Sequence, residues 1–230
     1  MKRLIFTVLL FATQLGFSQT KITKSVGDFT SVKAFDKISV QLVESTETKV
    51  ELSGERSGDV ELVNKNGELK IRMAVDKSLK GEDVTAIVYF KKIEAVEASE
   101  GAYVSSPATF NAVEFAVSAK EGAEVKLTLD VKKVNIKANS GGMVRLTGKA
   151  SNQDIVVTSG GIVKASALEG EQTVVAVNAG GEADVTATDL VEAKTRAGGI
   201  ITIYGNPRQV NQKTIAGGTI RQHKLEKISK

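Results

Sequence analysis

The chain has 230 residues, of which 41% are hydrophobic and 25% are charged, and its formal net charge is +4. This composition is ordinary for a soluble globular protein, and so small a net charge does not favour a nucleic-acid partner. Because the chain has no cysteine, it can form no disulfide, thiolate nucleophile, cysteine-based metal site or cysteine-linked lipid anchor. Its stability must therefore come from packing alone.

The first residues predict a secretory signal peptide rather than a folded element. Lys2 and Arg3 give a basic start, Leu4–Leu15 is mostly apolar, and Gly16 and Ser18 are the small residues of a cleavage site. We expect cleavage after Ser18 and export to the periplasm or cell surface. No second apolar stretch is long enough for a membrane span.

Residues 19–95 predict an N-terminal β region. The hairpin signal Asn66-Gly67 stands between two alternating segments. The expected strands are 35–43, 49–52, 60–63, 68–73 and 84–90. We expect them to pack on the repeat that follows, or to begin it, and to cap its N-terminal end.

Residues 96–222 contain a repeat in which a glycine, usually the first of a pair, recurs every 18–21 residues. The first glycines are Gly101, Gly122, Gly141, Gly160, Gly180, Gly198 and Gly217. A phosphate-binding loop would occur once and would precede a helix, and no helical pattern follows these glycines. The repeat instead predicts an all-β, single-domain parallel β-helix or solenoid with about seven rungs. A β-sandwich remains the alternative, because short strands separated by turns also suggest that fold.

Aligned on the first glycine, the repeats show apolar columns three and five residues to either side. Alternation with polar residues predicts two short strands in each rung, with one face directed inward. The columns become polar at their ends, at Ser106, Gln212 and Gln222, as capping requires. We expect each corner to need one special backbone dihedral, at the first glycine, because the second position is alanine in two repeats. Residues 223–230 form a charged tail that we expect to be loosely held.

Several segments together resemble the putative auto-transporter adhesin head GIN domain family. They are 35–42, 50–55, 66–71, the repeated Ser-Gly-Gly units and Ile203-Tyr-Gly-Asn-Pro207. The resemblance spans residues 29–220 and implies an exported β-helical envelope protein. It implies no activity, and no catalytic residues come with it.

The residues available for catalysis are few. His223 is the only histidine, so a histidine-based triad or metal cluster cannot be built. Glu124, Glu182 and Asp184 are a poor arrangement for acid–base chemistry. We therefore predict a non-catalytic protein without cofactor or metal; a carbohydrate-active solenoid enzyme acting on polysaccharide is the alternative.

Outward columns of basic residues are the candidate ligand site. Lys126, Arg145 and Lys164 occupy one column in consecutive rungs, and like charges in register are mildly destabilising. The remaining candidates are Lys137, Lys194, Arg196 and Lys213. These residues form either a solvated sheet face or a basic stripe for an anionic glycan or envelope polymer. Together these observations predict an adhesin-like envelope protein that presents a rigid surface to such a polymer or to another envelope protein.

Overall fold

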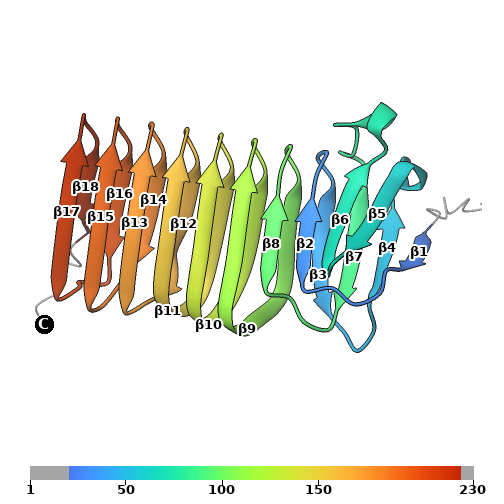
Figure 1. The fold of residues 1–230 in the computed structure, drawn as a ribbon, viewed down its shortest axis with the longest axis horizontal. Coiled ribbons are helices and arrows are strands. Elements are labelled where there is room, and N and C mark those ends of the chain that lie inside the picture. Colours follow the sequence, from blue (N-terminus) through green and yellow to red (C-terminus); the bar gives the residue numbers. More distant parts are fainter. Residues whose placement is uncertain (1–20, 224–230) are drawn as a thin grey trace, which may run out of the picture.

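The computed structural model describes residues 21–223 and forms a β-solenoid (Figure 1). Each turn of the chain, or rung, contributes one strand to a front sheet and one to a back sheet, and the rungs stack along one long axis. The predicted solenoid is therefore confirmed, and the alternative β-sandwich is not formed. The predicted signal peptide, residues 1–18, and residues 224–230 of the predicted tail lie outside the described residues.

The strands of the N-terminal part are short. They are β1 (Ile22–Ser25), β2 (Ser31–Ala34), β3 (Ser39–Glu44), β4 (Lys49–Ser53), β5 (Val60–Lys65), β6 (Glu68–Met73), β7 (Thr85–Phe90) and β8 (Ala95–Ala98). Two 3₁₀ turns, η1 (Ser57–Asp59) and η2 (Val75–Lys77), interrupt them.

Longer strands begin the regular part of the solenoid. They are β9 (Tyr103–Lys120), β10 (Glu124–Asn139) and β11 (Met143–Thr158), followed by β12 (Ile162–Glu169), β13 (Gln172–Asn178), β14 (Glu182–Thr186), β15 (Leu190–Arg196), β16 (Ile200–Tyr204), β17 (Gln209–Ile215) and β18 (Thr219–Gln222). The three long strands bend, so each supplies a segment to both sheets. The front sheet runs β6, β2, β8, the C-terminal segments of β9 to β11, β13, β15 and β17. The back sheet runs β7, β3, the N-terminal segments of β9 to β11, β12, β14, β16 and β18.

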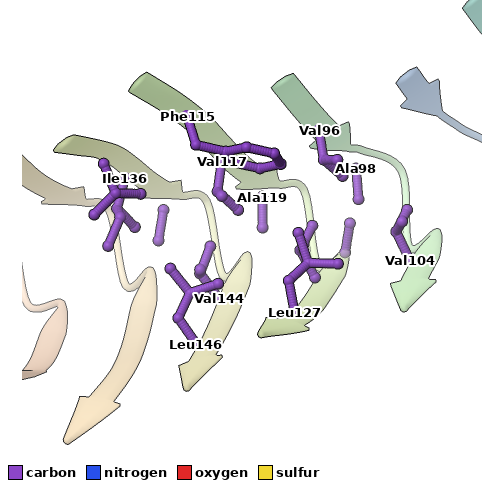
Figure 2. Close-up of a cluster of buried hydrophobic side chains, with 14 of the residues drawn as sticks. Val96, Ala98, Val104, Phe115, Val117, Ala119, Leu127, Ile136, Val144 and Leu146 are labelled. Atoms are coloured by element: carbon purple, nitrogen blue, oxygen red, sulfur yellow. The ribbon is translucent and has the colours of Figure 1, made fainter. Parts of the chain in front are cut away.

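The interior is filled by side chains that stack on their equivalents in the next rung. Val125, Val144 and Val163 are consecutive partners in the back sheet, and all three are fully buried. Ile136 from the front sheet and Leu146 from the back sheet point into the same interior (Figure 2). Burying each such aliphatic side chain contributes about 1.5–3 kcal/mol. The predicted inward columns are thus the core.

The corner between the sheets requires two residues with positive φ, not one. Ser140 has φ 48° and Gly141 has φ 75°, the combination of a type I′ turn. The other first glycines, and the residue before each, share this conformation. The second glycine can also be restricted by space, because a Cβ on Gly142 would lie 2.2 Å from the carbonyl oxygen of Ala119 in the preceding rung. The first glycine therefore has the special dihedral that we expected, but our expectation that only this position is restricted is wrong.

One rung carries no glycine signal and was missed by sequence analysis. Strands β2 and β3 are joined by a corner at Asp36 and Lys37, with φ 58° and 62°. In register, Ala34 lies beside Ala98, and Val40 lies beside Val104. The expected strand 35–43 is therefore wrong in its first part. The glycine repeat does not reveal this rung, because Lys37 stands where the other rungs have the first glycine of the corner.

The N-terminal end departs from chain order. The β2–β3 rung lies between β6–β7 and β8–β9, so its neighbours on both sides come later in the sequence. Beyond β6 and β7, strands β5 and β4 pair antiparallel with them, and β1 pairs antiparallel with β4. The predicted hairpin at Asn66-Gly67 is confirmed, with φ 54° and 77°.

The last rung of the described chain, β17 and β18, has polar groups where earlier rungs have core residues. Gln212, Thr214 and Gln222 are exposed, whereas Val210 and Ile220 are half-buried. Between residues 21 and 223, no helix is long and apolar enough to cross a membrane.

Candidate functional site

The first basic column lies on the outer face of the back sheet. Lys126, Arg145 and Lys164 are consecutive partners there. Arg145 Nε lies 2.7 Å from a carboxylate oxygen of Glu124, and Lys164 Nζ lies 2.9 Å from one of Asp184. These carboxylates offset the expected repulsion and neutralise much of the column.

The other four candidates lie on the outer face of the front sheet, on the opposite side of the solenoid. Lys194 and Lys213 are direct partners in register, and Arg196 follows on the same face of β15. Lys137 lies three rungs away, beyond Val156 and Ala176. The structure therefore divides the seven residues between two faces. Lys126, Arg145 and Lys164 lie together on one face. Lys194, Arg196 and Lys213 lie together on the other, at a distance from Lys137.

Lys194 and Lys213 line a shallow groove, which we call the C-terminal basic groove. Arg196 lies on the same face of β15 as Lys194 but is not part of the groove lining. The volume of the groove is about 390 Å³, and its outward lining side chains are Val174, Ala176, Glu192, Lys194, Asn211 and Lys213. The side chain of Val174 is 47% exposed and forms part of the floor. Within residues 21–223, no carboxylate oxygen lies within 4.0 Å of the cationic nitrogens of Lys194, Arg196 or Lys213. Glu192 is the only acidic residue in the lining.

A second groove, the N-terminal groove, lies on the same face toward β2. Its volume is about 430 Å³, and Lys33, Glu97, Ser118, Asn135 and Lys137 contribute to its lining. Lys33 Nζ lies 2.8 Å from a Glu68 oxygen, and this contact raises the pKa of Lys33. The positive charge of this groove is therefore partly neutralised, although Lys137 has no carboxylate partner within the described residues.

Asp36 and Glu100 form an acidic edge at the corner of β2 and β3, where Asp36 supports the fold. The buried Asp36 carboxylate accepts hydrogen bonds from the backbone N–H of Met73 at 3.0 Å and of Leu79 at 2.7 Å. Burial, followed by the charges of Asp36 and Glu121, raises the pKa of Glu100. Among the residues described, no group of three or more His, Asp or Glu side chains is placed to hold a metal ion.

His223, the one histidine, is exposed at the end of the described chain. Its ring lies 5.0 Å from that of Tyr204, and its backbone N–H donates to the carbonyl of Ile203 at 2.8 Å. These contacts hold the end of β18 against β16 and assemble no triad.

Sequence analysis missed the uncharged residues of the front face. Val156, Val174 and Ala176 face outward beside the cations, and their small side chains create the floor between longer neighbours. The sequence did contain a signal for this floor, because Val156 and Val174 occupy outward positions at which most of the other repeats have polar residues.

The fold recurs in solved structures. A putative adhesin from Bacteroides fragilis NCTC 9343 is 19% identical, with 90% of this chain and 98% of that chain covered and a TM-score of 0.80. A putative adhesin from Parabacteroides distasonis ATCC 8503 is 20% identical, with 89% and 96% covered and a TM-score of 0.72. A putative lipid binding protein from the same organism is 14% identical, with 91% and 98% covered and a TM-score of 0.66. At these identities the likeness concerns the fold alone.

No curated protein matches the chain. The family model described as "Putative auto-transporter adhesin, head GIN domain" matches residues 28–207. This match covers most of the solenoid, from the strand β2 to the loop after β16. The chain therefore belongs to the auto-transporter adhesin head GIN domain family.

Proposed function

We propose that the protein is an exported, non-catalytic envelope adhesin that binds an anionic glycan through the C-terminal basic groove. The proposal rests chiefly on Lys194, Arg196 and Lys213, which lie together on one face without carboxylate partners among residues 21–223. Holding like charges in adjacent rungs costs stability unless an anion joins them. The membership of an adhesin family agrees with a binding role.

The chemistry of the groove suits a charged sugar. Its ammonium groups can pair with carboxylate or sulfate groups, and the Asn211 amide can hydrogen-bond to hydroxyls. The methyl groups of Val174 and Ala176 offer an apolar floor for the C–H face of a sugar ring. Such contacts are exposed, so binding should weaken as ionic strength rises.

A matched pair of triple variants tests the proposal. Variant one replaces Lys194, Arg196 and Lys213 with serine, and variant two makes the same change at Lys126, Arg145 and Lys164 on the opposite face. Both lose three positive charges, so a nonspecific charge effect would weaken both equally.

We expect variant one to bind heparin and polygalacturonate roughly 10- to 100-fold more weakly, because three exposed charge contacts of about 0.5–1 kcal/mol each are lost. Variant two should bind like the wild type. Equal loss in both variants, or no binding by the wild type, contradicts the proposal. Cleavage of either polymer, measured as new chain ends, would instead support the carbohydrate-active enzyme.

Location is tested separately. Fractionation of the producing cells, followed by protease treatment of intact cells, should find the protein in the envelope and starting at Gln19. Recovery of an uncleaved chain in the cytoplasm would contradict export.

A further inference from the structure

The outer face of the front sheet carries a column that has no carboxylate from Ser118 onward, and we call this part the axial lane; the residue before Ser118 in register is Glu97. The residues of the lane are consecutive partners in register: Ser118, Lys137, Val156, Ala176, Lys194 and Lys213. The lane begins in the N-terminal groove and ends in the C-terminal basic groove. It therefore connects the two hollows of this face.

Cations stand toward both ends of the lane, with small side chains between them. Neighbouring rungs are about 4.8 Å apart, so the three steps from Lys137 to Lys194 span about 14 Å. Val156, which is 43% exposed, and the half-buried Ala176 lie between them. An extended ligand can therefore lie flat along the lane with an anionic group near each end.

The two flanks of the lane differ. On one side, Thr158, Asn178 and Arg196 are consecutive partners that offer hydroxyl, amide and guanidinium groups. On the other side, Asp154 is paired with Lys133 at 2.9 Å, and Glu192 remains as the acidic neighbour. The lane thus has one flank suited to the hydroxyl groups of a sugar chain and one that confines an anion to the lane.

We propose that an extended anionic polysaccharide lies along the solenoid axis and contacts Lys137 together with Lys194 and Lys213. This proposal rests on the proposed function and adds the direction of the ligand and a minimum length. A ligand that reaches both ends gains from the second contact without a second loss of translational freedom. Affinity should therefore depend steeply on chain length.

Oligogalacturonates from the disaccharide to the decasaccharide provide the test, with affinities measured by calorimetry. We expect affinity to increase at least tenfold once the oligomer can span the lane. Lys137→Ser should weaken binding of the long oligomers by about two- to fivefold and leave the shortest unchanged. Lys126→Ser, which removes one cation from the back sheet, is the matched control. It should change the affinity of neither the long nor the short oligomers.

A second variant interrupts the lane without removing a cation. Val156→Glu places a carboxylate in its middle and should reduce the affinity of long oligomers at least as much as Lys137→Ser. Val113→Glu is the control, because Val113 is 79% exposed and lies outside the lane. Circular dichroism of each variant checks that the solenoid is intact.

The outcomes separate the two proposals. If long and short oligomers bind equally, and Lys137→Ser and Val156→Glu have no effect, the axial lane is overturned while the C-terminal basic groove stands. If no oligomer or polymer binds, the proposed function fails and the lane fails with it.

Discussion

The glycine pair at the corner gives a quantitative test of how closely the rungs approach. A Cβ on Gly142 would lie 2.2 Å from the oxygen of Ala119 and 2.6 Å from the nitrogen of Lys120. Increasing the distance between this Cβ and the Ala119 oxygen from 2.2 Å to 3.0 Å requires the two backbones to move apart by at least about 0.8 Å. That shift is about one sixth of the 4.8 Å between rungs.

Such a shift would break the local hydrogen bonds. The Met143 N–H donates to the carbonyl of Ala123 at 2.8 Å, and the Gly142 N–H donates to that of Asn139 at 2.8 Å. Losing both costs about 2 kcal/mol, and overpacking adds about 1–3 kcal/mol. Alanine also reduces the conformational entropy of the unfolded chain, and this effect stabilises the folded variant by about 0.4–1 kcal/mol. We therefore expect Gly142→Ala to lower the free energy of unfolding by about 2–4 kcal/mol.

Gly141→Ala is the matched control, because it changes backbone conformation without a clash. Gly141 has φ 75° and open space around the Cβ position. The left-handed conformation costs alanine about 1–2 kcal/mol, less the same entropic gain, so we expect a net loss of about 1 kcal/mol. Urea unfolding followed by circular dichroism compares the two free energies, provided that their m values agree.

The reasoning would be refuted if Gly142→Ala were as stable as the wild type or more stable than Gly141→Ala. The corner would then adjust to a Cβ, as it does around Ala123 one rung earlier.

Three further variants test other parts of the fold. Lys37→Gly should raise the free energy of unfolding by about 0.5–1 kcal/mol, because Lys37 has φ 62° and glycine removes that strain; a lower urea midpoint would contradict this. Glu100→Gln should raise the melting temperature at pH 7. Burial and the Asp36 charge raise the pKa of Glu100, so the wild-type protein loses stability as the pH rises through that raised value and the carboxyl group ionises. Glutamine does not ionise and avoids this loss. The gain should vanish below the usual pKa of 4.5, and a gain that persists there would refute the assignment. Gln153→Ala should cost about 2–4 kcal/mol by urea unfolding, because the buried amide donates to two carbonyl oxygens at 3.1 and 3.2 Å; a loss below 1 kcal/mol would show that water replaces it.

Much of the architecture could be predicted because a solenoid places like residues on like. The recurrence of glycine and of inward aliphatic residues was enough to identify the rungs from Gly101 onward and the direction of their side chains. The rung at β2 and β3 could not be found in this way, since Lys37 adopts the corner conformation without being glycine. Its position out of chain order depends on long-range pairing that no local pattern encodes.

The candidate site was predictable only as separate columns. Register correctly placed Lys126 beside Arg145, and Lys194 beside Lys213. Ion pairing depends on how side chains reach between rungs, so the contact of Arg145 with Glu124 could not be read from spacing. The division of the cations between two faces follows from the corner geometry and changes which of them can bind one ligand.

The out-of-order position of β2 and β3 has a consequence for how the chain folds. Regular rungs pair with residues about one repeat away, as Glu124 does with Met143. By contrast, Ser31 pairs with Ala95 and with Glu68, so this rung has no partner until much more of the chain is available. Loop closure over such separations is slow, whereas addition of each later rung is local. Folding should therefore wait for one slow nucleation step over residues 31–105 and then propagate toward the C-terminus, which gives the molecule a kinetic polarity.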